Sequence, residues 1–123
     1  MLREPDLGRV REILACIAAI DLADATATRH AGDPGVATVV VDAIRYRLVK
    51  IGDAVGSLSL ELREDHPAVA WSDLARLPDL IGEADDELDP EMALAAVGQP
   101  LRRLRSACQA ILGESVRAGE DEP

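Results

Sequence analysis

The chain has almost no aromatic side chains. Phenylalanine is absent from its 123 residues, and Trp71 and Tyr46 carry the two aromatic rings. The hydrophobic fraction of 48% must therefore pack through aliphatic side chains, which suits helices better than a β-sandwich. A chain of this length is most simply one domain, which buries roughly two-thirds of the surface that it exposes when unfolded.

Long apolar runs and a basic leader are also missing. No run approaches the roughly 18–20 residues that a membrane span requires. Residues 1–6 lack the basic start and the apolar stretch of a secretory signal. We therefore expect a soluble cytoplasmic protein with no membrane segment.

Cysteine is scarce, and both cysteines lie among apolar neighbours at helical spacing. Cys16 and Cys108 are expected to be reduced and buried, because the cytosol keeps thiols reduced and cysteine packs as a small hydrophobe. Neither has a metal-ligand spacing such as C-x-x-C. We expect no structural metal and no cofactor.

Positive charge is outnumbered, with 13 basic residues against 23 acidic ones and a net charge of −10. RNA binding is therefore not expected, because phosphate contacts from Lys and Arg supply most non-specific affinity. Basic side chains still gather in two places, which are Arg45 with Arg47 and Arg102 with Arg103 and Arg105. Both groups are interpreted as solvated or salt-bridged helix surface.

Negative charge is concentrated in residues 79–91, which hold seven carboxylates and no basic side chain. Three interpretations stay open for this segment: a solvated acidic loop, a surface that binds a partner, and a site for Mg²⁺ or Ca²⁺. The segment lacks the alternating acids and the turn glycine of an EF-hand, which counts against the metal site.

Apolar periodicity predicts an all-α fold. A first helix is expected over residues 5–29 and a second, about 28 residues long, over residues 36–63. Glycine and proline in residues 32–35 predict a break between them. Gly52 and Gly56 lie inside the second helix, where we interpret them as places of close packing with another helix.

Two shorter helical predictions follow. His66-Pro67 ends the second helix, because the residue before a proline is pushed out of the α region. A short third helix is expected with Ser72 as its N-cap, and Pro78 should stop or kink it near Leu77.

A fourth helix is expected to begin at residues 89–90, with aspartate as cap and proline in the first turn. Pro100 should bend or split it near Val97. The composition divides the chain into a helical domain at residues 1–113 and an acidic flexible tail at residues 114–123.

Residues 36–112 resemble the HepT-like family of bacterial HEPN-fold proteins in three segments. Residues 41–54 are similar to the family's long-helix pattern apolar-Arg-x-x-Leu-x-x-Ile-Gly-Glu-Ala, with Asp53 in place of the glutamate. Residues 62–75 are similar to its Arg-x-x-His-Pro-x-Ile-Pro-Trp signature, which is the most specific of the three. The third segment is the final helix, residues 89–112.

The resemblance implies an up-and-down HEPN-like bundle of about four to five helices, usually a homodimer. Many members are toxins partnered with a minimal nucleotidyltransferase antitoxin. Their ribonuclease motif is an arginine, a histidine five residues later, and a tyrosine two residues after that. The motif's arginine, the asparagine that follows it, its histidine and its tyrosine correspond to Pro78, Asp79, Glu83 and Asp85.

None of these four residues matches the motif. RNA cleavage without a metal needs a base near neutrality and a cation beside the phosphate. Acidic side chains instead repel a phosphate by several kcal/mol at short range. We therefore expect a pseudoenzyme that keeps the fold and the homodimer and acts through protein interaction. Loss of the tyrosine also removes the residue that the family's nucleotidyltransferase modifies with AMP.

Two alternative functions stay open. The first is an active metal-independent endoribonuclease toxin with a displaced residue set, for which the candidates are Arg45, Arg76 and Glu83. The second is a nucleotide-binding module, although no glycine-rich phosphate loop supports it.

Several conspicuous side chains are interpreted as structural. His66 belongs to a His-Pro turn, and Trp71 anchors the short helix on the bundle. Arg45 and Asp53, two turns apart, are interpreted as a residual salt bridge, and Tyr46 as a half-buried ring.

Overall fold

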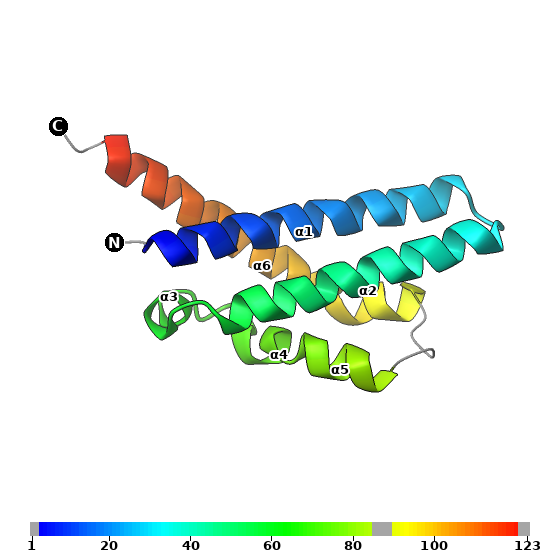
Figure 1. Cartoon of the computed structure of the whole chain (residues 1–123). Helices are drawn as coiled ribbons and strands as arrows, with labels where there is room; N and C mark the ends of the chain where they lie inside the picture. Colours follow the sequence, from blue (N-terminus) through cyan, green and yellow to red (C-terminus); the bar gives the residue numbers. More distant parts are fainter. Residues whose placement is uncertain (1–2, 85–89, 121–123) are drawn as a thin grey trace.

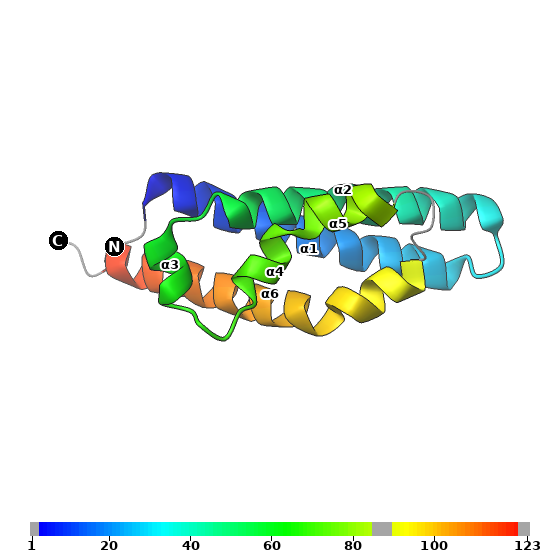
Figure 2. The ribbon, with the colours of Figure 1, turned by 90° about the horizontal axis from the view of Figure 1, so that it is seen from below.

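The computed structural model describes residues 3–84 and 90–120, with side chains described at residues 3–82 and 98–116. The described residues form helices and no strands. In chain order the helices are α1 (Glu4–Arg29), α2 (Pro34–Gly56), α3 (Leu60–Glu64), α4 (Trp71–Ala75), α5 (Leu77–Ala84) and α6 (Pro90–Glu120). Figures 1 and 2 show α1 and α2 as an antiparallel hairpin, with α6 against α1 and with α4 and α5 against α2.

The turn between α1 and α2 confirms the predicted break. Gly32 has a φ of 92°, which glycine adopts without steric cost. The Asp33 carboxylate accepts hydrogen bonds from the N–H groups of Gly35 at 2.9 Å and Val36 at 3.3 Å. This cap lets α2 begin at Pro34, slightly before the expected start.

The hydrophobic core consists of the aliphatic stripes that the periodicity predicted. Each helix of the main bundle contributes residues that are almost fully buried. These are Val10, Ile13, Ile17 and Ile20 of α1, Ile44, Leu48, Ile51 and Val55 of α2, and Leu101, Leu104 and Ile111 of α6. Each such side chain contributes roughly 1.5–3 kcal/mol when it is removed from water. Cys16 and Cys108 are free and buried among them, as expected.

The predicted single helix over residues 36–63 is wrong. α2 ends at Gly56, and a separate short helix, α3, follows. Ser59 caps α3, and its N–H and hydroxyl both donate to the buried Asp6 carboxylate, at 3.0 and 2.6 Å. A tertiary contact with α1 therefore redirects the chain. Leu58, between α2 and α3, is buried although it lies in no helix, so the apolar spacing in the sequence continues past the end of α2.

The expected N-cap at Ser72 is also wrong. Ala70 precedes α4 without a side-chain cap, and the helix begins at Trp71. The indole N–H of Trp71 donates to the His66 carbonyl at 2.9 Å, which ties the helix start to the His-Pro turn. Trp71 is 7% exposed, so its predicted role as an anchor is confirmed.

Residues 77–84 form a helix that was not predicted from the sequence. α4 stops at Ala75, near the predicted interruption, and α5 resumes at Leu77 with Pro78 in its first turn. A proline there loses no hydrogen bond, because the first N–H groups of a helix have no partner within it. The acidic segment of residues 79–91 thus begins as helix, and residues 85–89 lie outside the described structure.

α6 is one continuous helix that begins at Pro90, as expected. Asp89, its expected cap, and the Val97 side chain lie outside the description. Pro100 does not split the helix, and Figure 2 shows α6 bowed between its yellow and orange parts. The helix extends past residue 113 to Glu120, so its last turns include residues that the composition assigned to the tail.

Candidate functional site

Pro78 and Asp79, which the resemblance aligns with the first two residues of the ribonuclease motif, lie at the start of α5, where it packs on α2. A Cβ atom added to Gly52 would lie 2.3 Å from Pro78 Cδ, 2.8 Å from Pro78 Cγ and 3.0 Å from the Leu74 carbonyl oxygen. The predicted close packing at Gly52 is therefore confirmed. At Gly56 an added Cβ would only make an ordinary contact of 3.9 Å with Ala75, so close approach does not require that glycine.

This contact determines what position 78 offers to a ligand. The Pro78 ring is half-buried against α2, while Asp79 beside it is exposed. Neither residue supplies a cation or a titrating base near neutrality. The remaining motif positions are not described: the Glu83 side chain and the whole of Asp85 lie outside the described residues.

The displaced candidates are separated along the bundle. Arg76 is exposed at the junction of α4 and α5. Arg45 is half-buried on α2, seven residues before Gly52, which places it on nearly the same side of that helix. Since α5 packs on α2 and runs antiparallel to it (Figure 1), the later part of α5 approaches the level of Arg45. The structure thus brings Arg45, but not Arg76, toward the described end of α5.

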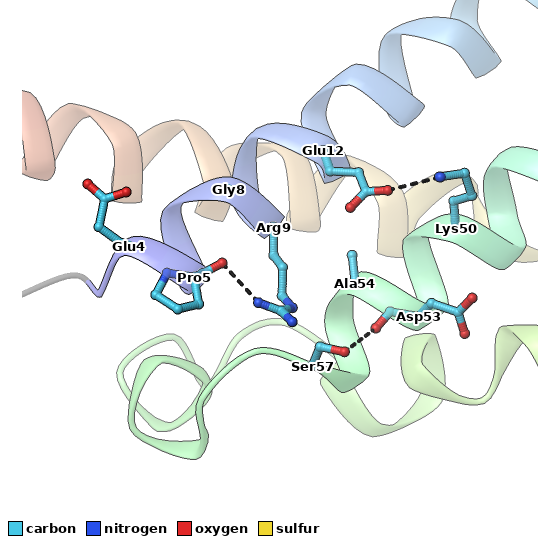
Figure 3. A pocket seen from close by; sticks show the side chains of 9 residues that line it. All are labelled: Glu4, Pro5, Gly8, Arg9, Glu12, Lys50, Asp53, Ala54 and Ser57. Atoms are coloured by element: carbon cyan, nitrogen blue, oxygen red, sulfur yellow. Dashed lines mark hydrogen bonds and ion pairs between the residues drawn. The ribbon is translucent and has the colours of Figure 1, made fainter.

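A pocket of about 420 Å³ lies between the start of α1 and the end of α2 (Figure 3). Its polar groups largely engage one another. Lys50 pairs with Glu12 at 3.2 Å, and Arg9 donates to the Pro5 carbonyl at 3.2 Å. The pKa of Lys50 is raised by its hydrogen bond to Glu12 and, next, by the nearby Tyr46.

Asp53 also lines this pocket. Its backbone carbonyl accepts the Ser57 hydroxyl at 3.0 Å. Figure 3 shows its carboxylate turned away from Arg9. Lys50 is thus ion-paired and Arg9 is hydrogen-bonded to the backbone, and we assign the pocket no ligand.

A second, larger cleft of about 620 Å³ lies between the His66–Pro67 turn and α6. Arg102 and Arg103 line it, whereas Arg105 forms an ion pair with Asp21 on α1. The interpretation of these arginines as salt-bridged or solvated helix surface is confirmed, because Arg105 is ion-paired and both Arg102 and Arg103 are exposed. It did not foresee that the turn and α6 would meet, since the two segments are more than thirty residues apart.

The described residues offer neither a reactive thiol at Cys108 nor a cluster of metal ligands. Burial raises the pKa of the Cys108 thiol to about 12, which keeps it protonated and unreactive near neutrality. Among the described residues, no three His, Cys, Asp or Glu side chains gather as a metal site. Within the same residues, no helix is long and apolar enough to cross a membrane.

Some large apolar side chains remain exposed on the outside of the bundle. Val39 is 68% exposed, and Tyr46, expected to be half-buried, is 57% exposed. The Tyr46 ring lies beneath two cations, with Arg47 at 5.4 Å and Lys50 at 5.6 Å from its centroid. Exposed Ala43 lies between Val39 and Tyr46 in sequence and on the same side of α2. We call Val39, Ala43 and Tyr46 the α2 strip.

Comparison with known proteins adds no relative: no family model, no curated protein and no solved structure matches the chain.

Proposed function

We propose that this chain is a degenerate HepT-like HEPN protein that acts through protein–protein contacts rather than through RNA cleavage. The contact between Pro78 and Gly52 supports this most directly. The position that corresponds to the family's arginine carries a rigid, half-buried ring with neither charge nor hydrogen-bond donor. Exposed Asp79 next to it would repel a phosphate.

The α2 strip supports a protein-binding role, and its proposed occupant is a second copy of this chain. Its residues are spaced by four and three, the spacing that forms a helix–helix seam. In a two-fold contact the same surface meets itself. An antiparallel crossing of two α2 helices centred between residues 42 and 43 would place Val39 opposite Tyr46 of the partner subunit.

A minimal nucleotidyltransferase is the second partner that the sequence resemblance implies, within a toxin–antitoxin-type module. The net charge of −10 favours a partner with a basic surface, because complementary charge speeds association and disfavours wrong partners. Co-expression with the product of a neighbouring nucleotidyltransferase gene, followed by co-purification, tests this pairing.

Oligomeric state tests the homodimer. Tyr46→Asp should convert the dimer to monomer in analytical ultracentrifugation, because it places a charge in the seam opposite the apolar Val39 of the partner subunit. Leu22→Asp is the matched control, since Leu22 is 64% exposed on α1 and lies outside the strip. A wild-type monomer at high concentration, or a dimer unaffected by Tyr46→Asp, argues against this interface.

A cleavage assay on single-stranded RNA separates the pseudoenzyme from the ribonuclease alternative. The purified wild type should leave the RNA uncut, and Arg45→Gln, Arg76→Ala and Glu83→Ala should behave in the same way. Cutting by the wild type that these substitutions abolish would establish the displaced site instead.

A constructive version of the experiment rebuilds the motif. The combined variant carries Pro78→Arg, Asp79→Asn, Glu83→His and Asp85→Tyr. Gain of RNA cleavage or of toxicity on expression would support descent from an active HEPN scaffold. A folded but inert variant would show that the activity depends on further positions.

A further inference from the structure

The cleft between the His66–Pro67 turn and α6 differs in charge from the rest of the protein. Arg102, Arg103 and His66 line it, and Asp65 is the carboxylate among its described lining residues. The pocket of Figure 3, by contrast, presents Glu4, Glu12 and Asp53 beside its two basic side chains. The cleft is thus a locally basic site on a chain whose net charge is −10.

Within the part of the chain that the structure describes, the two arginines of the cleft form no ion pair. Among the described residues no carboxylate pairs with Arg102 or Arg103, although Arg105, one turn away, pairs with Asp21. The Arg102 Nη1 atom lies 3.4 Å from the position that a Cβ of Gly98 would occupy. The guanidinium therefore folds back along α6 over a residue that has no side chain.

The opposite wall of the cleft is held in place by hydrogen bonds to the backbone of His66. The His66 carbonyl accepts the Trp71 indole N–H at 2.9 Å and the Val69 N–H at 3.3 Å. The His66 N–H donates to the Arg63 carbonyl at 3.2 Å. A turn fixed at both ends and pinned by a buried tryptophan costs little entropy to order around a ligand.

Donors and apolar surface lie side by side in the cleft. His66, Gln99, Arg102, Arg103 and Ser106 supply N–H and O–H groups, while Pro67, Val69 and Ala107 supply apolar contact. Several donors from different directions suit a tetrahedral dianion, and guanidinium groups bind phosphate oxygens through paired hydrogen bonds. The volume of about 620 Å³ lies within the usual range for small-molecule sites.

From this arrangement we propose that the cleft binds a small organic phosphate monoester. The phosphate lies against Arg102, Arg103 and His66, and the organic group lies on Pro67 and Val69. Because both arginines are exposed, binding is weak, with a Kd of roughly 1 mM for inorganic phosphate. This inference does not depend on the proposed protein-binding function, because the α2 strip and the cleft share no residue.

Calorimetric titration of the full chain with inorganic phosphate and with phenyl phosphate tests the site. Phenyl phosphate should bind about tenfold more tightly than inorganic phosphate, because its ring covers the apolar wall. Arg102→Gln with Arg103→Gln should weaken both ligands by about tenfold or more. NMR spectra should show shifts centred on the amides of His66 and Ser106.

Two further variants make the result decisive. Arg29→Gln removes one positive charge from the exposed end of α1, outside the cleft, and should leave both affinities unchanged. Gln99→Glu places a carboxylate in the cleft at an exposed helix position and should weaken binding without affecting the fold. Equal affinities in the wild type and the double arginine variant, or no binding at all, would overturn the proposal. AMP binding more than about tenfold tighter than phenyl phosphate would replace it with a nucleotide site.

Discussion

The two sides of α2 contribute to stability in opposite ways. Toward the core the helix presents Ile44, Ile51 and Val55, which are at most 1% exposed. About 80° around the same helix it presents Gly52, whose missing side chain admits the Pro78 ring and the Leu74 carbonyl. The first side is stabilised by large buried side chains, whereas the second is stabilised because Gly52 has no side chain and lets Pro78 approach closely. A substitution that enlarges a residue therefore helps or harms according to the side on which it falls.

The same contrast explains why Pro78 is tied to the scaffold. Pro78 lies in the tightest contact of the α5 side, so its identity serves packing as well as the start of α5. The α2 strip and the cleft beside α6 lie outside both packed sides. Binding surfaces of this protein are therefore expected where neither kind of packing constrains the side chains.

Truncation on the core side should have the largest effect. Ile51→Ala should lower the free energy of unfolding by about 2–5 kcal/mol, because Ile51 is fully buried and leaves a cavity. Urea unfolding followed by circular dichroism measures the change. Leu22→Ala on the exposed surface is the control and should remain within about 0.5 kcal/mol of the wild type. A comparable loss in both variants would contradict the core assignment.

Enlargement on the other side should come next. Gly52→Ala should destabilise by about 1–3 kcal/mol, because the new methyl group meets a rigid ring and a backbone carbonyl. Gly8→Ala, in open space on α1, should instead stabilise by up to about 1 kcal/mol.

Removing the ring should restore part of this loss. In a double-mutant cycle, Pro78→Ala combined with Gly52→Ala should show a favourable coupling of about 0.5–3 kcal/mol. Additive effects of the two substitutions would mean that α5 does not press on Gly52.

The end of α2 offers a third test, because the chain leaves both packed sides there. Asp6→Ala should cost about 1–3 kcal/mol through the loss of the two hydrogen bonds from Ser59. Hydrogen exchange should also increase in residues 57–64. Asp24→Ala removes an exposed carboxylate from the same helix and should change stability by less than about 0.5 kcal/mol.

The last expected effect concerns alkaline pH and amounts to about 1.4 kcal/mol between pH 8 and pH 10. The pKa of Cys108 is raised from 9.0 to about 12, so the folded state holds its proton after the unfolded state has lost it. Stability from this group is complete below pH 9 and falls as pH rises toward 12, by at most about 1.4 kcal/mol per unit. Cys108→Ala should flatten that decline in unfolding experiments at pH 8 and pH 10. The same slope in both proteins would contradict the burial of this thiol.

Much of the bundle followed from apolar spacing. The stripes of α1, α2 and α6 became the core because a 3.6-residue period leaves little freedom in which face is buried. The turn at Gly32 and Asp33 was also predictable, because left-handed backbone favours glycine and helix N-caps favour residues such as aspartate. Close packing at Gly52 was expected, but its partner, Pro78, was not.

The misplaced boundaries share one cause. α2 ends at Gly56 because the Ser59 hydroxyl donates a hydrogen bond to Asp6, which is far away in sequence. α4 begins at Trp71 because its indole bonds to the His66 carbonyl, whereas Ser72 looked like the better cap. Both boundaries depend on hydrogen bonds across the fold, which local propensity does not contain.

The amino-acid sequence alone determined that this chain is helical, which aliphatic side chains are buried, and that residues 78–85 carry no arginine or histidine. These properties depend on composition and on spacing within about two turns of helix. The tertiary structure decided that Pro78 lies against Gly52, that the outer side of α2 stays exposed, and that His66 meets Arg102 and Arg103 across a cleft. Such contacts join residues remote in sequence, and only the packing of the helices brings them within reach.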